Sequence, residues 1–182
     1  MTLTDIANIA LEEIGAKSIG NIDGDESNAR KVKRRLPLTI ADVASKHNWS
    51  CLVRDVKLYR IDEPQPEGGM YKFNRPKWMF KIIEPRFGVS VEGDYILAST
   101  EELTVKCTIC DEDPAKWDSC FLLSVIAQLK ADICFMVVGD AQLALNLKQL
   151  AEIDIRRYMR QDSFAKKNRK PPTPLLPDGF EL

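Results

Sequence analysis

The spacing of apolar residues changes twice along this chain, and that change limits the folds that the chain can adopt. Near both ends, apolar side chains recur at the three-to-four-residue interval that is typical of amphipathic helices. Between residues 51 and 110, short runs of mixed apolar and polar residues alternate with turn signals, which is typical of antiparallel strands. The sequence therefore predicts a mainly α protein with a small antiparallel β insertion, an α+β fold.

The apolar stripes predict a bundle of about four helices. The predicted ranges are 3-15, 27-47, 114-138 and 141-162. Pro37 lies inside the second range and removes a backbone hydrogen bond there, so we expect a kink or a break. Asp113 and Pro114 are predicted to begin the third helix, which is apolar on nearly every side and therefore central. Gly139 is predicted to end that helix, and Asp140 to cap the fourth.

The middle of the chain is predicted to form a β meander. Candidate strands lie near residues 51–59, 78–83, 88–91, 95–97 and 103–109. Prolines and glycines concentrate between residues 62 and 76, which indicates a long loop. Residues 1-164 are predicted to form a single domain. Residues 165-182 contain four prolines, which favour an extended C-terminal arm.

The charge balance excludes a strong general attraction to nucleic acid or to an anionic membrane. The chain has 26 basic and 27 acidic residues, a formal net charge of -1. Gln128, Lys130 and Asp132 interrupt the longest apolar run, so no membrane span is predicted. The N-terminal helix carries acids where an export signal carries bases. Five cysteines at ordinary frequency favour reduced thiols and synthesis in a cytoplasm.

No residue pattern predicts a catalytic, metal or cofactor site. Cys107 and Cys110 have the spacing of a redox or zinc site, but such residues on a strand point to opposite faces, and the sequence has no second pair of this spacing. The sole histidine is His47, and no serine or cysteine lies in a recognisable nucleophile setting. A glycine-rich phosphate loop is also missing from the sequence. We therefore expect a protein that is not an enzyme and that uses no cofactor.

Two basic clusters are the candidates for partner contact. The first, on the second predicted helix and mostly opposite its apolar stripe, contains Arg30, Lys31, Lys33, Arg34 and Arg35. Such a cluster is either a solvated helix face or a surface for phosphates or an acidic partner. The second cluster contains Lys166, Lys167, Arg169 and Lys170. The proline-rich segment that follows is either a disordered end or an arm that docks through Leu175, Leu176 and Phe180.

Two stretches carry a resemblance to a known family. The first is IANIALEEIGAKSIGNIDG followed by SNARKVKRRLPLTIADVASKHNWSC, a helix pair that ends near Trp49. The second is GDYILASTEELTVKCTICDEDPAKWDSCFLLSVIAQLKADICFMVVGDAQLALNLKQLAE, with a turn, two strands, Asp-Pro, an aromatic residue, a long helix, a Gly-Asp break and a final helix. In order and spacing these stretches resemble the tail tubular protein A family of phage head-to-tail connectors. The loop at residues 63–75, Pro37 and the C-terminal arm lie outside the resemblance.

This resemblance implies a structural protein of the phage virion, assembled in the host cytoplasm and located in the neck or tail. Members of the family form a ring of about twelve copies below the portal protein and present a platform to the tail nozzle or tube protein. They are often monomeric until the portal templates the ring, and DNA passes through the channel without specific binding. The family's C-terminal segment reaches toward the portal. The residues expected to contact the portal here are Lys166, Lys167, Arg169, Leu175, Leu176 and Phe180. Those expected to face a neighbouring subunit or the DNA are Arg30, Arg34 and Arg35.

Two other functions fit parts of the sequence. A small DNA-binding accessory protein would use the basic helix around residues 30-35 and would bind duplex DNA in a salt-dependent way. A proline-rich ligand would use residues 171–177 to occupy an aromatic-lined groove. In the connector interpretation, the β insertion faces either a neighbouring subunit or the tail.

Overall fold

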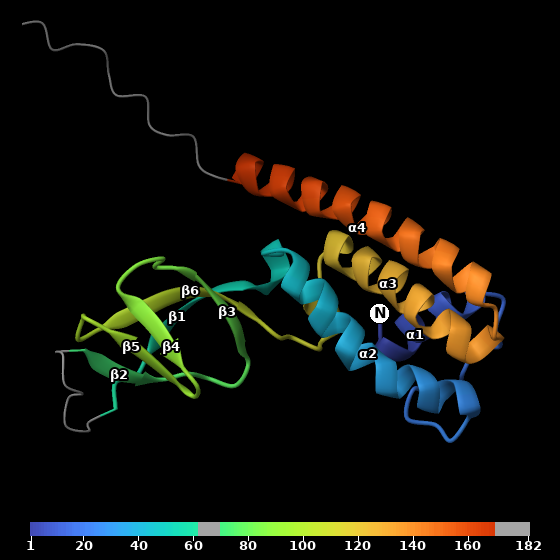
Figure 1. Ribbon diagram of the computed structural model, residues 1–182, viewed down its shortest axis with the longest axis horizontal. Coiled ribbons are helices and arrows are strands. Elements are labelled where there is room, and N and C mark those ends of the chain that lie inside the picture. The colour runs from blue at the N-terminus through green and yellow to red at the C-terminus, as the bar shows by residue number, and fades with distance from the viewer. Residues whose placement is uncertain (62–69, 170–182) are drawn as a thin grey trace, which may run out of the picture.

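The computed structural model describes residues 1–61 and 70–169, and these residues form a helical lobe and a β lobe (Figure 1). The helical lobe contains α1 (Leu3–Glu13), α2 (Ser27–Lys46), α3 (Ser119–Val138) and α4 (Ala141–Arg169). The β lobe is inserted between α2 and α3. Its strands are β1 (Val53–Leu58), β2 (Tyr71–Asn74), β3 (Met79–Glu84), β4 (Val89–Glu92), β5 (Tyr95–Ala98) and β6 (Leu103–Ile109). The predicted α+β fold, mainly helical with a small antiparallel β insertion, is confirmed.

Helix α3 is the central element of the helical lobe, because it packs against α4, α2 and α1. By length and composition alone α3 is apolar enough to cross a membrane, which the sequence argument had excluded. Its mean hydropathy is 1.9, but 56% of the helix is buried inside the protein. The neighbouring helices therefore account for its composition, as they do for the core helix of many proteins. Gly139 ends α3 with a positive φ of 81°, and Asp140 caps α4 by accepting from the Leu143 amide at 2.9 Å, as predicted.

Helix α2 continues through Pro37 as one element, so the predicted break is absent. Pro37 lies on the exposed side of the helix, where water can reach the carbonyl group that the proline leaves without a donor. The buried side of α2 carries the apolar stripe that the sequence predicts, including Val32, Leu36, Ile40 and Val43. Burial of this stripe against α3 stabilises the helix despite the proline.

Two predicted helix boundaries are wrong. The third helix begins at Ser119 rather than at residue 114, because Pro114–Lys116 form a separate 3-10 turn capped by Asp113. Asp118 then caps α3 by accepting from the Phe121 amide at 2.9 Å. The fourth helix ends at Arg169, so the first residues of the predicted extended arm are helical. Four of these five residues, Ala165, Lys166, Lys167 and Arg169, are good helix formers, and Lys166 pairs with Asp162 one turn earlier. The rest of the predicted arm, residues 170–182, lies outside the described residues.

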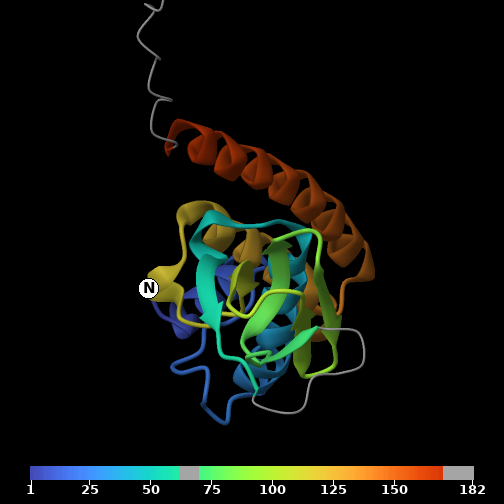
Figure 2. The ribbon, with the colours of Figure 1, turned by 90° about the vertical axis from the view of Figure 1, so that its left-hand side faces the viewer.

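The β lobe consists of two small antiparallel sheets, with strand orders β1-β6-β3 and β2-β5-β4. Only β4 and β5 are both consecutive and paired, so the order differs from the predicted single meander. Strand β2 lies in the stretch that was predicted to be a loop. It pairs with β5, with Phe73 opposite Ile96. Viewed end-on in Figure 2, the strands wrap around a common interior.

Each lobe has its own hydrophobic core. The helical core centres on Trp49 and Phe121, whose ring centroids are 5.5 Å apart, and the Trp49 indole donates to the Val43 carbonyl at 2.8 Å. The β core lies between the two sheets. It contains Leu58, Phe73, Met79, Ile96, Ala98, Leu103, Val105 and Cys107. Because these cores are separate, the position of the β lobe depends on the two connecting segments, residues 47–52 and 110–118.

Candidate interaction surfaces

The first candidate surface is a basic groove on the helical lobe. It has a volume of about 450 Å³ and lies between the first half of α2 and the end of α3. Its lining residues are Ser27, Arg30, Lys31, Arg34, Arg35, Leu38 and Met136. The helical repeat of α2 brings Arg30, Arg34 and Leu38 onto one face, since they are spaced at intervals of four. The groove therefore gathers all three arginines that the sequence predicted for a subunit or DNA contact.

The cations of the basic groove differ in what they contact. Lys31 donates to the Met136 carbonyl at 2.6 Å, and Arg35 donates to the Asp132 carboxylate at 3.1 Å. Both side chains thus hold α2 against α3. Arg30 and Arg34, in contrast, make no ion pair or side-chain hydrogen bond with any of the described residues, and both are exposed. These two guanidinium groups are therefore available to an anionic partner.

The basic groove also has apolar walls, which the sequence analysis missed. Leu38 is 60% exposed and Met136 is 42% exposed, although both are large apolar residues. Leu38 lies outside the buried apolar stripe of α2, and its position relative to that stripe could have predicted its exposure from the sequence. The exposure of Met136 could not be predicted in this way, because α3 is apolar on nearly every side and has no distinct apolar stripe. Exposed apolar side chains beside unpaired cations are typical of a site for a protein segment that is both acidic and apolar.

A polar network beside the basic groove accounts for two of the residues that interrupt the apolar run of α3, Gln128 and Asp132. Asp132 accepts hydrogen bonds from Arg35, from the Thr39 hydroxyl at 2.7 Å and from the Gln128 amide at 3.0 Å. Gln128 in turn accepts from Lys46 at 3.1 Å. These polar side chains on α3 are thus satisfied by α2, and they fix the spacing of the two helices that form the groove.

The second feature is a buried carboxylate at the junction of the two lobes. Asp162 on α4 is 2% exposed, and it accepts from His47 Nε2 at 2.9 Å and from the Ser50 amide at 3.1 Å. Lys166 lies 3.2 Å from the same carboxylate and also donates to the Asn48 carbonyl. Burial alone would raise the pKa of Asp162, but the hydrogen bonds from His47, Ser50 and Lys166 outweigh it and hold the pKa well below its usual range. Asp162 therefore fastens α4 to the segment that leads into the β lobe.

A second hollow lies beside this junction, between α4 and His47 at the end of α2. It has a volume of about 390 Å³ and is lined by His47, Arg156, Met159, Arg160, Ser163 and Phe164. Phe164 is 66% exposed, and Leu150 and Ile153 on the same helix are 54% and 63% exposed. Leu150 follows Leu143 and Leu147 at helical spacing, which predicts burial, but the structure shows that it is not buried. Helix α4 thus presents apolar side chains to solvent as well as to α3.

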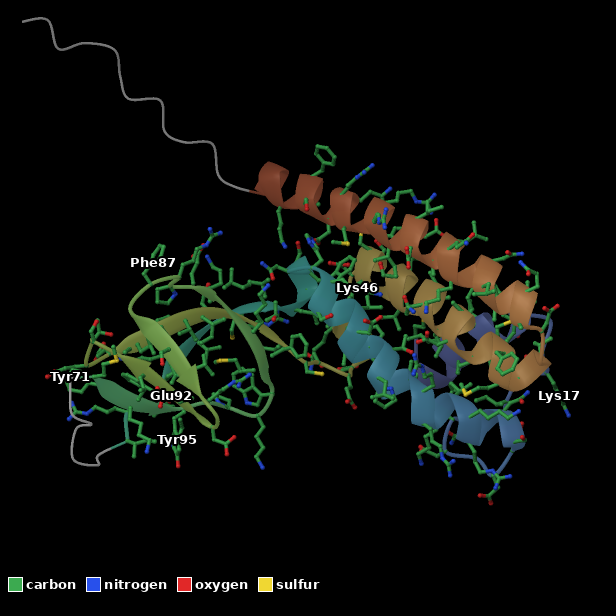
Figure 3. All side chains as sticks on the ribbon, in the orientation of Figure 1. Lys17, Lys46, Tyr71, Phe87, Glu92 and Tyr95 are labelled. Atoms are coloured by element: carbon green, nitrogen blue, oxygen red, sulfur yellow. The ribbon has the colours of Figure 1, made fainter. Side chains whose placement is uncertain are left out.

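The third candidate surface is aromatic and lies on the β lobe. Phe87, in the loop between β3 and β4, is 89% exposed, and Tyr59 is 82% exposed. Figure 3 shows Phe87 projecting from the upper edge of the lobe, away from Tyr71 and Tyr95. Aromatic residues that protrude in this way commonly anchor protein interfaces. The loop signals in the sequence predicted a turn here, but they gave no reason to select Phe87.

The predicted portal-contact residues fall into three groups. Lys166 is held within the protein by Asp162 and Asn48, so its charge is not free for a partner. Lys167 and Arg169 lie in the last turns of α4. Leu175, Leu176 and Phe180 lie outside the described residues. Lys166 thus contacts the junction within the chain, and its contact with the portal stays a prediction.

The cysteines form no apparent reactive group in the described part of the chain. All five are free thiols, and Cys107 is buried in the β core while Cys110 lies beyond the end of β6. Burial raises the pKa of the Cys51 thiol to about 12, and it also raises that of Cys107. These thiols are therefore protonated and weakly nucleophilic at neutral pH. Among the described residues, no group of three histidine, cysteine, aspartate or glutamate side chains is placed to hold a metal ion.

Comparison with known proteins adds no relative to these observations. No model of a known protein family matches the chain, and no curated protein matches its sequence.

Proposed function

We propose that this protein is a head-to-tail adaptor of a phage virion, which forms a ring between the portal protein and the tail. The observation that carries the proposal is the order of elements along the chain. A helix pair ending in a tryptophan precedes a β insertion, and an Asp-Pro turn, a long apolar helix, a Gly-Asp break and a final helix follow. The resemblance to the tail tubular protein A family rests on this same order. In this role the protein is structural and not an enzyme, and it resides in the virion neck.

The exposed surfaces of the molecule support the adaptor proposal, because several of them are suited to contacts with other proteins. Exposed apolar side chains occur on α4, at the basic groove and on the β lobe. An adaptor in a ring needs at least four contacts, namely with two neighbours, the portal and the tail nozzle or tube. We assign the portal contact to the end of α4 and the residues after it, where Lys167 and Arg169 lie. Phe87 and Tyr59 on the β lobe are assigned to a neighbouring subunit or to the tail protein.

The adaptor proposal is tested by mixing the purified protein with its cognate portal ring. Separation by size with mass detection should show a closed, multi-copy complex, formed by a protein that elutes as a monomer when alone. Many modest interfaces in such a ring produce tight overall binding. A protein that stays separate from the portal at every salt concentration is not a portal adaptor.

A second function is favoured by one observation, the unpaired Arg30 and Arg34. A small DNA-binding accessory protein would place phosphates against these guanidinium groups. Binding to duplex DNA would then weaken steeply as salt is raised, with a slope that counts the phosphates contacted. If replacing both arginines by glutamate left DNA binding and its salt slope unchanged, this second function would be excluded.

A further inference from the structure

We infer that the basic groove of one subunit binds the acidic, apolar end of the C-terminal segment of the next subunit in the ring. This inference rests on the proposed ring, and it names the contact that closes it. It also gives Leu175, Leu176 and Phe180 a different partner from the portal expected by resemblance. Portal contact then falls to the last turn of α4, with Lys167 and Arg169.

The first reason is charge complementarity. The groove presents Arg30 and Arg34 without partners among the described residues, and the carboxylate of Asp132 is already paired with Arg35. The last twelve residues of the chain, 171–182, contain two carboxylates, Asp178 and Glu181, and no basic residue. Two guanidinium groups facing two carboxylates make charge-assisted hydrogen bonds, which are stronger than those between neutral groups.

The second reason is that both surfaces also carry apolar groups. Leu38 and Met136 are exposed at the groove. The carboxylates of the C-terminal segment are interspersed with Leu175, Leu176 and Phe180. A phosphate backbone would match the arginines of the groove but not its exposed leucine and methionine. An acidic, apolar peptide matches both, and for this reason we favour it over DNA.

The third reason is geometry, which makes the contact one between subunits. The end of α3 meets the first half of α2, where Lys31 donates to the Met136 carbonyl. The last part of α4 instead meets the C-terminal end of α2, where Asp162 contacts His47. Figure 1 shows that the start of α2 and the end of α4 lie at opposite ends of the helical lobe. The groove, lined by the first half of α2, is therefore far from Arg169, the last residue of α4.

The distance between these two ends follows from the rise of the α-helix. Arg34 and His47 are separated by about 20 Å along α2, and α4 continues about 10 Å beyond Asp162, away from the groove. Even when fully extended, the chain from residue 170 to Asp178 spans only about 30 Å. This length equals the straight distance back to the groove of the same subunit, so it is too short for a path that must go around the lobe. A neighbour that presents its groove near Arg169 is reached without this restriction. A contact between opposite ends of successive copies is heterologous, and such contacts produce a closed ring when the rotation from one copy to the next closes on itself.

The test begins with a fluorescein-labelled peptide of residues 171–182, titrated with the full-length protein and followed by anisotropy. We expect saturable binding that weakens about tenfold or more in the variant Arg30→Glu/Arg34→Glu, since two charge-assisted contacts are reversed. The same variant should regain affinity for a peptide that carries Asp178→Lys and Glu181→Lys. The matched control is Arg86→Glu/Lys148→Glu, which makes the same change of charge at exposed positions outside the groove and should bind the original peptide as the wild type does.

Mixing two full-length variants separates contact between subunits from contact within one. The groove variant Arg30→Glu/Arg34→Glu and the tail variant Asp178→Lys/Glu181→Lys should each sediment as monomers. At concentrations above the dissociation constant of the peptide, which are higher than those of the portal experiment, both the wild type and the mixture of the two variants should associate, because each groove then meets a tail of opposite charge. Circular dichroism of each variant establishes that it is folded. If the mixture stays monomeric above the dissociation constant of the peptide, the contact is not made between subunits.

Three results would overturn the inference. The peptide fails to bind the wild type, it binds the groove variant equally well, or duplex DNA rather than the peptide binds in a way that depends on Arg30 and Arg34. None of these assays contains the portal. Loss of peptide binding with portal association intact therefore refutes only the tail contact, and peptide binding without portal association refutes only the adaptor role.

Discussion

Replacing Asp162 by asparagine tests whether this buried carboxylate fastens α4 to the segment that leads into the β lobe, as its contacts indicate. The substitution keeps the shape of the side chain but removes its charge. It weakens the bonds from His47 and Lys166, and the bond from the Ser50 amide can persist. A hydrogen bond to a charged group contributes about 1.5–3 kcal/mol, but the side chains of both His47 and Lys166 are partly exposed and can turn to water. We therefore expect a loss of about 2 kcal/mol in the free energy of unfolding, which lowers Tm by about 5 °C in a protein of this size.

The pH dependence gives this prediction a second, independent readout. The pKa of Asp162 is lowered in the folded protein, so its contribution to stability is complete above the unfolded-state pKa and is lost as the pH falls. The stability difference between wild type and Asp162→Asn should therefore be constant from neutral pH to about pH 5, and should shrink below about pH 4. Urea unfolding followed by helical circular dichroism measures it at each pH.

A control on the same helical lobe is Asp42→Asn. Asp42 forms an exposed ion pair with Lys46, and its loss should change the free energy of unfolding by less than about 0.5 kcal/mol. If Asp162→Asn cost no more than Asp42→Asn, or if its cost did not change between neutral pH and about pH 3, the carboxylate would not hold the junction.

Three further predictions concern other parts of the molecule. Phe121→Ala should lower the free energy of unfolding by about 3–5 kcal/mol in urea melts, because the ring is fully buried against Trp49 and Trp117; a loss below about 1 kcal/mol would contradict that core. Gly139→Ala should cost about 1 kcal/mol in the same assay, because φ at Gly139 is 81°, and an unchanged Tm would contradict the αL cap. Phe87→Ala should leave the Tm unchanged within about 1 °C but should weaken assembly into portal–tail complexes, since the ring is exposed; a folding defect without an assembly defect would remove Phe87 from the interface.

The helical part of the fold was predictable from the sequence because its signals are local and repeated. The stripe of α2 extends over five turns, and the Gly139–Asp140 break combines a helix stop with a helix start. The errors occurred where two local signals competed. Asp113-Pro114 is a good helix start, but Asp118 is another, and the chain uses the first for a short 3-10 turn.

The β lobe was predictable in its strands but not in their order. Strand β2 has only four residues between prolines and glycines, so its composition resembles that of a loop, and pairing with β5 determines its conformation. The register of β1 against β6 joins residues far apart in sequence, and no local pattern specifies it. Antiparallel pairing was foreseeable from the short spacing of the strands, whereas their division into two sheets depends on tertiary packing.

The candidate surfaces were predictable only where charge identified them. The cluster of Arg30, Arg34 and Arg35 stood out in the sequence, but only the structure shows that Arg35 is bound to Asp132 while Arg30 and Arg34 are free of partners among the described residues. Asp162 carried no local signal, because its partners His47 and Ser50 are more than a hundred residues away. The spacing of apolar residues along the sequence does not predict long-range polar contacts of this kind.

Electron microscopy of the protein mixed with its portal ring tests the adaptor account most directly. The account predicts a ring of density below the portal, with as many copies as the portal has subunits, into which the helical lobe and the β lobe fit. It also predicts that the basic groove of each copy meets density from its neighbour. If the portal ring looks the same with and without the protein, even when the protein is in large molar excess over the portal, the account is contradicted.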